Sequence, residues 1–173
     1  MSTPDSVELD DLVAGCAASH QRLLAWLDAR HLDSAAPSAL PDWTLGHVLT
    51  HLARNADGFA NMLEGAAAGE VREMYVGGFP ARNADIAAGA ARPWAEQVAD
   101  VRGATSRLGR AWARLDAEAW EREGTTAFGP IQVWVIPRRR WREVEVHWLD
   151  LGLDYTWHDF PAELVRLDLP ARR

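Results

Sequence analysis

The stretch WREVEVHWLDLG places a carboxylate, Glu143, four residues before an imidazole, His147. On a helix this spacing brings both side chains to one face, one turn apart, where both can reach a single ion. On a strand the alternation would instead gather Glu143, Glu145 and His147 on one side. We favour the helix, because the segment 139–151 is longer than a typical strand and its last two leucines break the alternation.

A second pair of chemically capable residues lies in WTLGHVLTHLARNAD, where His47 and His51 are also four residues apart. Val48 and Leu52 must face a core, so His51 is tilted inward while His47 lies nearer the edge of the apolar face. An inward histidine must form a hydrogen bond or bind a metal, because an unsatisfied polar group costs about 1–3 kcal/mol. His51 is therefore either an ordinary core histidine or a metal ligand. Facing helices of a bundle are common places for metal sites.

The first half of the chain indicates long helices that would position these residues. Apolar residues recur at helical spacing over residues 6–29, and loop-forming prolines and small polar residues follow. Thr44 is a suitable N-cap for a second helix that carries His51. An alanine-rich, helical pattern then covers residues 82–119, and Pro93 is expected to divide it into a short and a long helix.

The second half predicts a change in backbone and then a last main helix. Residues 123–137 are rich in β-branched and aromatic types between Gly and Pro, which indicates an extended or weakly stranded crossover. Pro137 is expected near the start of a helix that reaches Leu151, with Gly152 as its C-terminal cap. A turn and one short terminal helix follow. The predicted fold is all-α, a four-helix bundle with a long crossover between helices 3 and 4.

Composition narrows the class of protein. The chain has 173 residues, which fits one domain over residues 1–173, and 48% of them are hydrophobic. A net charge of -7 argues against nucleic acid as the main partner. The sequence contains neither a signal peptide nor an apolar run long enough to cross a membrane, so we expect a cytoplasmic protein. The single cysteine, Cys16, excludes an internal disulfide and is interpreted as a small buried residue.

A basic cluster, RRRWR at residues 138–142, precedes Glu143. We interpret it as a solvated first turn of the last main helix. The alternative is a substrate-facing role for one of its arginines.

Two segments together resemble a known family. PDWTLGHVLTHLARNADGF, followed by RRRWREVEVHWLDLGLDYT, is similar to the mycothiol-dependent maleylpyruvate isomerase family, within the wider DinB-like group of four-helix metalloproteins. The similarity covers nearly the whole chain. It implies a DinB-like four-helix bundle that binds a divalent metal, usually zinc, through His51, Glu143 and His147.

The resemblance also implies a reaction. In this family a low-molecular-weight thiol, mycothiol, serves as cofactor, and its thiolate would add to the cis double bond of maleylpyruvate. Rotation in the adduct and elimination would then give fumarylpyruvate. We therefore expect a zinc-dependent, mycothiol-using isomerase or thiol S-transferase whose partners are a small-molecule thiol and an electrophilic substrate. The alternatives are a non-catalytic, DinB-like, stress-related metal-binding protein and a helical bundle whose polar residues are only structural.

Arg82 receives a role by the same resemblance, whereas Asn55 and Asp57 receive theirs from their position along the helix. Arg82 matches a position where the family often carries arginine, and we expect it to act in catalysis by binding a substrate carboxylate. Asn55 and Asp57 lie about one turn beyond His51 and are expected to orient ligands or bind cofactor hydroxyl groups; the alternative is that both are solvent-facing helix residues. Characterised members resemble two-domain proteins, and this chain is expected to supply their metal and thiol half. Bundles of this group often pair, so a homodimer is expected.

Overall fold

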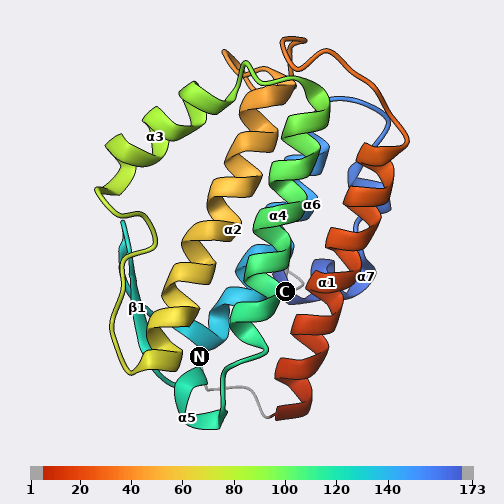
Figure 1. Ribbon diagram of the computed structural model, residues 1–173. Helices are drawn as coiled ribbons and strands as arrows, with labels where there is room; N and C mark the ends of the chain where they lie inside the picture. The colour runs from red at the N-terminus through yellow and green to blue at the C-terminus, as the bar shows by residue number, and fades with distance from the viewer. Residues whose placement is uncertain (1–5, 169–173) are drawn as a thin grey trace.

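The computed structural model describes residues 6–168, and helices dominate it. Four long helices form a bundle, and shorter elements lie beside it (Figure 1). The long helices are α1 (Ser6–Asp28), α2 (Leu45–Ala68), α4 (Trp94–Trp112) and α6 (Ile136–Asp150). The shorter elements are α3 (Gly78–Gly89), α5 (Ala117–Trp120), α7 (Ala162–Asp168), the strands β1 (Glu123–Thr126) and β2 (Gly129–Gln132), and two 3₁₀ turns at Val133–Val135 and Trp157–Asp159. The expected helical boundaries of α1 and α6 are confirmed.

The direction of each long helix follows from the contacts between them. Along α2 and α4, Thr50 bonds Gln97 and Arg54 bonds Asp100, so the two helices run in the same direction. Helices α1 and α6 also run in parallel, whereas α2 and α6 are antiparallel (Figure 1). Apolar side chains of all four helices form one continuous core.

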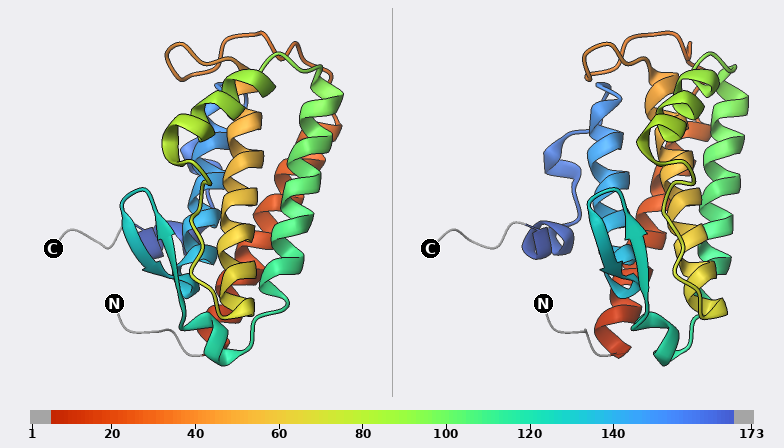
Figure 2. Two further views of the ribbon diagram at one scale, coloured as in Figure 1. Left: turned by 60° about the vertical axis from the view of Figure 1, so that its left-hand side comes forward. Right: turned by 90° about the vertical axis from the view of Figure 1, so that its left-hand side faces the viewer.

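The position of the long crossover differs from the prediction. Because α2 and α4 are parallel, the chain must return along the whole bundle between them, and residues 69–93, which contain α3, make this return (Figure 2). The segment 113–135 joins the ends of α4 and α6 and is not the crossover. Amphipathic spacing identifies the helices but carries no information about their direction. The prediction of a crossover between the last two long helices is therefore wrong, because the crossover lies between α2 and α4.

Part of the segment 123–137 is extended, as expected. Strands β1 and β2 pair antiparallel, with Glu123 opposite Gln132 and Thr126 opposite Gly129. This hairpin lies beside the bundle next to α6 (Figure 2). The backbone then becomes helical at Val133, earlier than the sequence indicated. The fold is thus mostly helical with one small hairpin.

Close packing of α1 against α6 depends on a glycine. A Cβ atom placed on Gly15 would lie only 2.2 Å from the ring of Trp141. The absence of that atom lets the indole fill the space between the two helices, where Trp141 is buried. This contact holds α6 at a fixed rotation about its axis, with Glu143 and His147 turned toward α2.

None of the helices within residues 6–168 has both the length and the apolar character that crossing a membrane requires.

Candidate metal centre

His51 lies in the second turn of α2 and points into the site. A capping box fixes the start of this helix. The Thr44 side chain accepts from the backbone N–H of His47, and the His47 ring bonds the backbone N–H of Thr44. His47 therefore has a structural role at the helix end. The core residues Val48 and Leu52 fix the rotation of α2, and the His51 side chain is turned toward α6, with only 4% of the residue exposed.

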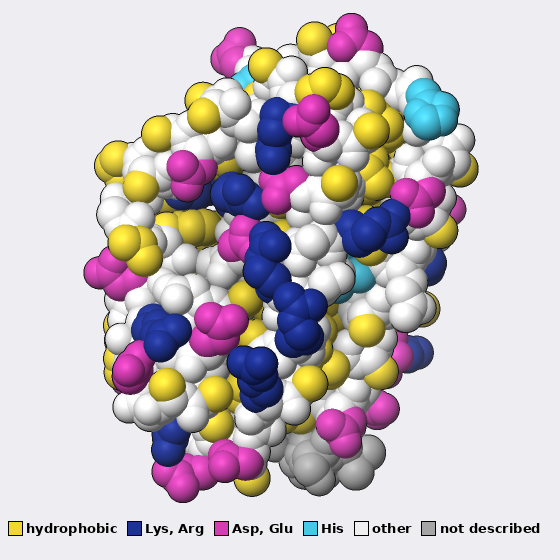
Figure 3. Space-filling view, in the orientation of Figure 1, with side chains coloured by type: hydrophobic (Ala, Val, Ile, Leu, Met, Phe, Trp, Pro, Cys, Tyr) yellow, Lys and Arg dark blue, Asp and Glu magenta, His cyan; other side chains and the backbone are white. Residues whose placement is uncertain are grey.

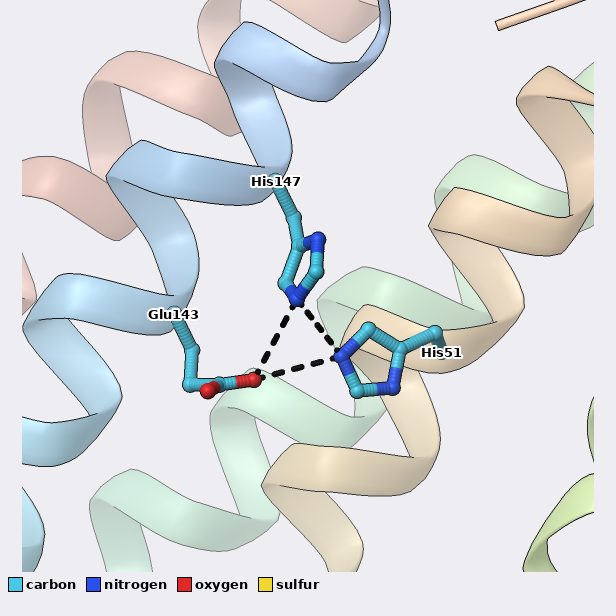
Figure 4. Close-up of side chains that lie close together, drawn as sticks. All are labelled: His51, Glu143 and His147. Atoms are coloured by element: carbon cyan, nitrogen blue, oxygen red, sulfur yellow. Dashed lines mark hydrogen bonds and ion pairs between the residues drawn. The ribbon is translucent and has the colours of Figure 1, made fainter. Parts of the chain in front are cut away.

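Glu143 and His147 lie one turn apart on the face of α6 that meets α2. Nε2 of His51 is 2.9 Å from Nε2 of His147 and 3.2 Å from Oε2 of Glu143. Oε2 of Glu143 is 3.5 Å from Nε2 of His147. The three atoms form a small triangle between the two helices (Figure 4). Glu145 points elsewhere, as the helical interpretation requires, and is fully buried beside Ser19 and Tyr155.

The size of this triangle fits one small cation. Zinc bound tetrahedrally at about 2.0–2.1 Å from nitrogen and oxygen holds its ligand atoms about 3.3 Å apart. The observed separations of 2.9 to 3.5 Å lie on both sides of that value. Two imidazoles and one carboxylate are also a common donor set for zinc that leaves a fourth position open. The residues present therefore fit a divalent metal, and His51, Glu143 and His147 form a candidate site.

Outer contacts orient two of the three ligands. Nδ1 of His147 lies 2.8 Å from Oδ2 of Asp150, a carboxylate–histidine arrangement typical of metal sites. Nδ2 of Asn55 donates to Oε2 of Glu143 at 3.1 Å. Oδ1 of the same amide accepts from the buried guanidinium of Arg140 at 2.8 Å. This pattern fixes the orientation of the Asn55 amide and, through it, of the Glu143 carboxylate.

The protonation states of His51 and Glu143 favour binding of a cation. Burial lowers the pKa of His51 to about 4, although the hydrogen bond with Glu143 opposes the shift. Burial alone raises the pKa of Glu143, but the neighbouring rings of His147 and His51 outweigh this effect and hold the pKa well below its usual range. At neutral pH His51 is therefore neutral and Glu143 is ionised. An ionised, half-buried carboxylate beside imidazole nitrogens attracts a positive ion.

The candidate metal centre lies in the wall of a cavity of about 930 Å³. Helices α2, α3, α6 and α7 and the turn of the hairpin all contribute to this cavity. Figure 3 shows a hollow beneath α3 with basic side chains at its edge. Four arginines line the cavity, namely Arg82, Arg138, Arg139 and Arg142. The cavity is thus basic although the whole chain is acidic.

Two further cavity residues, Arg82 and Tyr75, lie close to the ligands. Arg82 projects from α3, and its Nη2 lies 2.8 Å from Nδ1 of His51. Burial raises the pKa of Tyr75, and the neighbouring Arg82 guanidinium offsets this only in part. The Tyr75 phenol therefore keeps its proton at neutral pH. No periodic pattern in the sequence pointed to Tyr75, because this residue lies in the irregular connection between α2 and α3.

Asn55 and Asp57, which were expected to share a role, are separated by the structure. Asn55 lines the cavity and contacts Glu143. Asp57 is on the opposite side of α2, where it pairs with Arg54 and with Arg107 of α4. Two positions along a helix correspond to about 200° of rotation, so neighbours at this spacing face different ways. Asp57 is not among the residues that line the cavity.

The basic cluster of residues 138–142 is not uniformly solvated, which corrects its interpretation. Arg140 is fully buried and donates to Asn55, to the Leu52 carbonyl and to Nε2 of His20. The other three arginines of the cluster line the cavity, whereas the alternative gave a substrate-facing role to one of them. Arg140 and Asp150 are contacts of the site that sequence reasoning missed. The i+3 spacing from His147 to Asp150 was the available signal.

Fold and site together define a helical bundle with a candidate His–Glu–His metal centre between two of its helices. Residues 16–152 match the model of the mycothiol maleylpyruvate isomerase N-terminal domain, and the chain belongs to this family. The structure is similar to a crystal structure of the mycothiol-dependent maleylpyruvate isomerase, with a TM-score of 0.85 and 29% identity over 96% of this chain and 70% of the other. A histidine-to-alanine mutant of that enzyme gives a TM-score of 0.86 with 28% identity over the same shares. A search of curated proteins found no match.

Proposed function

We propose that this protein is a metal-dependent enzyme that uses a small-molecule thiol, mycothiol, to act on an anionic electrophile by cis–trans isomerisation or thiol transfer. The observation that carries the proposal is the convergence of His51, Glu143 and His147 on one point of a large cavity wall. Family membership supports the choice of thiol. A divalent cation at this point would supply Lewis acidity that lowers the pKa of a bound thiol and favours the nucleophilic thiolate.

The residues around the candidate metal centre have two different roles in binding a metal. The two histidines and Glu143 offer three ligand atoms on one side, and the cavity remains open on the other. Asp150 and Asn55 hold His147 and Glu143 in their orientations. This rigidity favours binding because the ligands need little reorganisation.

The arginines of the cavity indicate the charge of the substrate. Arg82 comes from α3, whereas Arg139 and its two cavity neighbours come from the first turns of α6, so the cationic groups border the cavity from two elements. Guanidinium groups bind carboxylates through paired hydrogen bonds. The substrate class that fits is a small carboxylate whose reactive carbon reaches the thiol near His51. A dicarboxylate such as maleylpyruvate belongs to this class.

Tyr75 has the properties of a proton donor at the same point. Its phenol lines the cavity and is protonated at neutral pH. Addition of a thiolate to a double bond conjugated with a carbonyl places negative charge on the carbonyl oxygen. A phenol O–H directed at that oxygen stabilises the charge without a full proton transfer.

Metal analysis and a thiol assay test the proposal. Protein purified without an affinity tag is expected to contain about one zinc or other divalent ion per chain by elemental analysis. With mycothiol it is expected to isomerise maleylpyruvate or to conjugate the thiol to an electrophile such as chlorodinitrobenzene, and His51→Ala is expected to lose the activity. Metal without any thiol-dependent turnover would instead favour the non-catalytic alternative. Absence of metal would exclude both.

A further inference from the structure

A continuous chain of polar contacts runs through both histidines of the candidate metal centre. Arg82 Nη2 lies 2.8 Å from Nδ1 of His51, and Nε2 of His51 lies 2.9 Å from Nε2 of His147. At the far end, Nδ1 of His147 lies 2.8 Å from Oδ2 of Asp150. The two ends of this chain differ chemically, because a guanidinium only donates hydrogen bonds and a carboxylate only accepts them.

The two ends determine where every ring proton lies. Arg82 must donate, so Nδ1 of His51 carries a lone pair and the His51 proton is on Nε2. Asp150 accepts from the N–H at Nδ1 of His147, which leaves a lone pair on Nε2 of His147. Nε2 of His51 therefore donates, and its acceptors are Nε2 of His147 at 2.9 Å and Oε2 of Glu143 at 3.2 Å. All donors in the chain meet acceptors, so this arrangement satisfies the site when no metal is bound.

A metal at the candidate site requires a different arrangement of protons at His51 alone. Both Nε2 atoms must present lone pairs to the ion. His147 already does so, with Asp150 holding its proton on Nδ1. A neutral His51 must move its proton from Nε2 to Nδ1, where the N–H would meet an N–H of Arg82. Two donors cannot bond each other, so the Arg82 contact cannot survive this change.

We propose that Arg82 is a metal-responsive arm, which caps Nδ1 of His51 in the metal-free protein and leaves it when a divalent cation binds Nε2. The surroundings allow this movement. Arg82 lines the large cavity, and its guanidinium carbon already lies 5.9 Å from the centre of the Trp43 ring, a contact that can persist when the hydrogen bond to His51 is broken. Nε of Arg82 is buried and has no hydrogen-bond partner, so the present position does not use all of its donors.

This movement of Arg82 rests on the proposed metal binding and sets an order of events, in which the metal binds first and Arg82 then leaves His51. Metal loading frees a cationic side chain at the cavity wall, where an anionic substrate group can then use it. Binding of the metal also carries the cost of breaking the Arg82–His51 hydrogen bond. Removal of Arg82 is therefore expected to strengthen metal binding, which is the reverse of what a supporting contact would do.

Zinc affinity tests this expectation without reference to turnover. Wild type, Arg82→Met and Arg139→Met are titrated with Zn²⁺ against a chromophoric chelator. Arg82→Met is expected to bind zinc at least tenfold more tightly than wild type, which corresponds to about 1.4 kcal/mol. Arg139→Met removes an equal charge from the same cavity and has no contact with His51, so it is expected to stay within about threefold of wild type, the size of a screened charge effect. Equal or weaker zinc binding by Arg82→Met, or an equal gain in Arg139→Met, would overturn the proposal.

The tautomer of His51 in the wild-type protein provides a second test. Long-range ¹H–¹⁵N spectra of the histidine rings are expected to show His51 protonated at Nε2 without metal and at Nδ1 with Zn²⁺. His147 is expected to keep its proton on Nδ1 in both states. If Nδ1 of His51 stays unprotonated in the zinc form, Arg82 remains bound and the proposal is wrong. A wild-type protein that binds no zinc would overturn the proposed function as well, whereas normal zinc binding without these changes would overturn only this inference.

Discussion

Nε2 of His51 lies 2.9 Å from Nε2 of His147, although 96 positions separate the two residues in the chain. This contact joins α2 to α6 at the wall of a large cavity. No local interaction brings these residues together. The contact depends on the antiparallel packing of two helices that are not neighbours in sequence.

Loss of one ligand is expected to abolish stoichiometric metal binding. His51→Ala should reduce zinc affinity by roughly 100-fold or more, because loss of a mere outer contact already reduces affinity about 10- to 100-fold. Equilibrium dialysis with Zn²⁺ measures the affinity, and circular dichroism shows whether the helices remain. His31→Ala is the matched control, since His31 is exposed on the loop after α1. Undiminished zinc binding by folded His51→Ala would contradict the ligand assignment.

Asn55 is expected to matter both for stability and for the metal. Asn55→Ala leaves a buried N–H of Arg140 without its amide acceptor, so the free energy of unfolding should fall by about 2–3 kcal/mol. Zinc affinity should fall about tenfold, because Glu143 loses the donor that orients it.

Asp57→Ala, on the same helix, is the control variant for Asn55→Ala. Asp57 forms partly exposed ion pairs, so its loss should change stability by less than about 1 kcal/mol and should leave zinc affinity unchanged. Urea unfolding and zinc titration measure the two quantities. Equal effects of the two substitutions would show that the Asn55 contacts have no special role.

The metal-free protein is expected to lose stability as the pH falls below about 6.5. Burial, followed by the positive charge of Arg140, holds the pKa of His20 well below its ordinary value of 6.5. The unfolded chain therefore binds a proton in this range that the folded chain does not, and stability decreases as the pH falls from 6.5 toward the folded pKa. His51 adds a loss of the same sign between about 6.5 and 4. Urea unfolding in EDTA at pH 7.5 and pH 5 measures the slope.

A substitution separates the contribution of His20. His20→Gln removes the titrating group, so its stability should depend less steeply on pH over the same interval. The absolute stability at pH 7.5 is expected to fall, because Nε2 of His20 accepts a hydrogen bond from Arg140. An unchanged slope in His20→Gln would mean that other groups cause the pH dependence.

Cys16 is expected to be inert in the folded protein. Burial raises its pKa from 9.0 to about 12, so at pH 8 the thiolate fraction is about a thousandfold lower than for an exposed thiol. Labelling with iodoacetamide, followed by mass spectrometry, should be slower by at least this factor than in urea. Rapid labelling of the native protein would contradict the buried position.

Cys16→Ala is the functional counterpart of that experiment. The thiol that the proposed reaction needs is a separate small molecule, so this variant should keep its zinc content and its thiol-dependent activity. Its stability should decrease by about 1–2 kcal/mol because a buried sulfur is removed. Loss of activity with normal zinc content would implicate the protein's own thiol in the chemistry.

The buried carboxylate of Glu145 is expected to anchor the segment that follows α6. Tyr155 and Ser19 donate to this carboxylate, and Tyr155 also stacks on Trp148 with ring centres 4.0 Å apart. Tyr155→Phe keeps the stacking but removes one donor from a buried charge, so unfolding free energy should fall by about 1–3 kcal/mol. Ser19→Ala should have a similar effect. Thermal unfolding measures both, and a stability equal to wild type in either variant would argue against the anchoring role.

The local elements of this protein were readable from the sequence. Period-3.6 spacing identified the helix that carries His51, and Thr44 acts as its N-cap as expected. The helical interpretation of the segment around Glu143 also agrees with the structure, and with it the division between Glu143, which faces α2, and Glu145, which faces α1. These features depend on contacts between residues a few positions apart, which the sequence order specifies directly.

Other features depended on the tertiary structure. Arg140 looked like a solvated residue in a basic run, and its burial depends on acceptors from α1 and α2 that are distant in sequence. Helical spacing alone separates Asn55 from Asp57, but only the packing of α2 decided that Asn55 faces Glu143 and Asp57 faces Arg107 of α4. The contact of Arg82 with His51 arises because residues 69–93 return along the bundle and bring α3 over the site. The sequence by itself determined which helices form and which residue types could bind a metal, because those properties are local. Only the tertiary structure decided helix direction, the burial of Arg140 and the donor that faces His51, because each depends on which distant segments pack together.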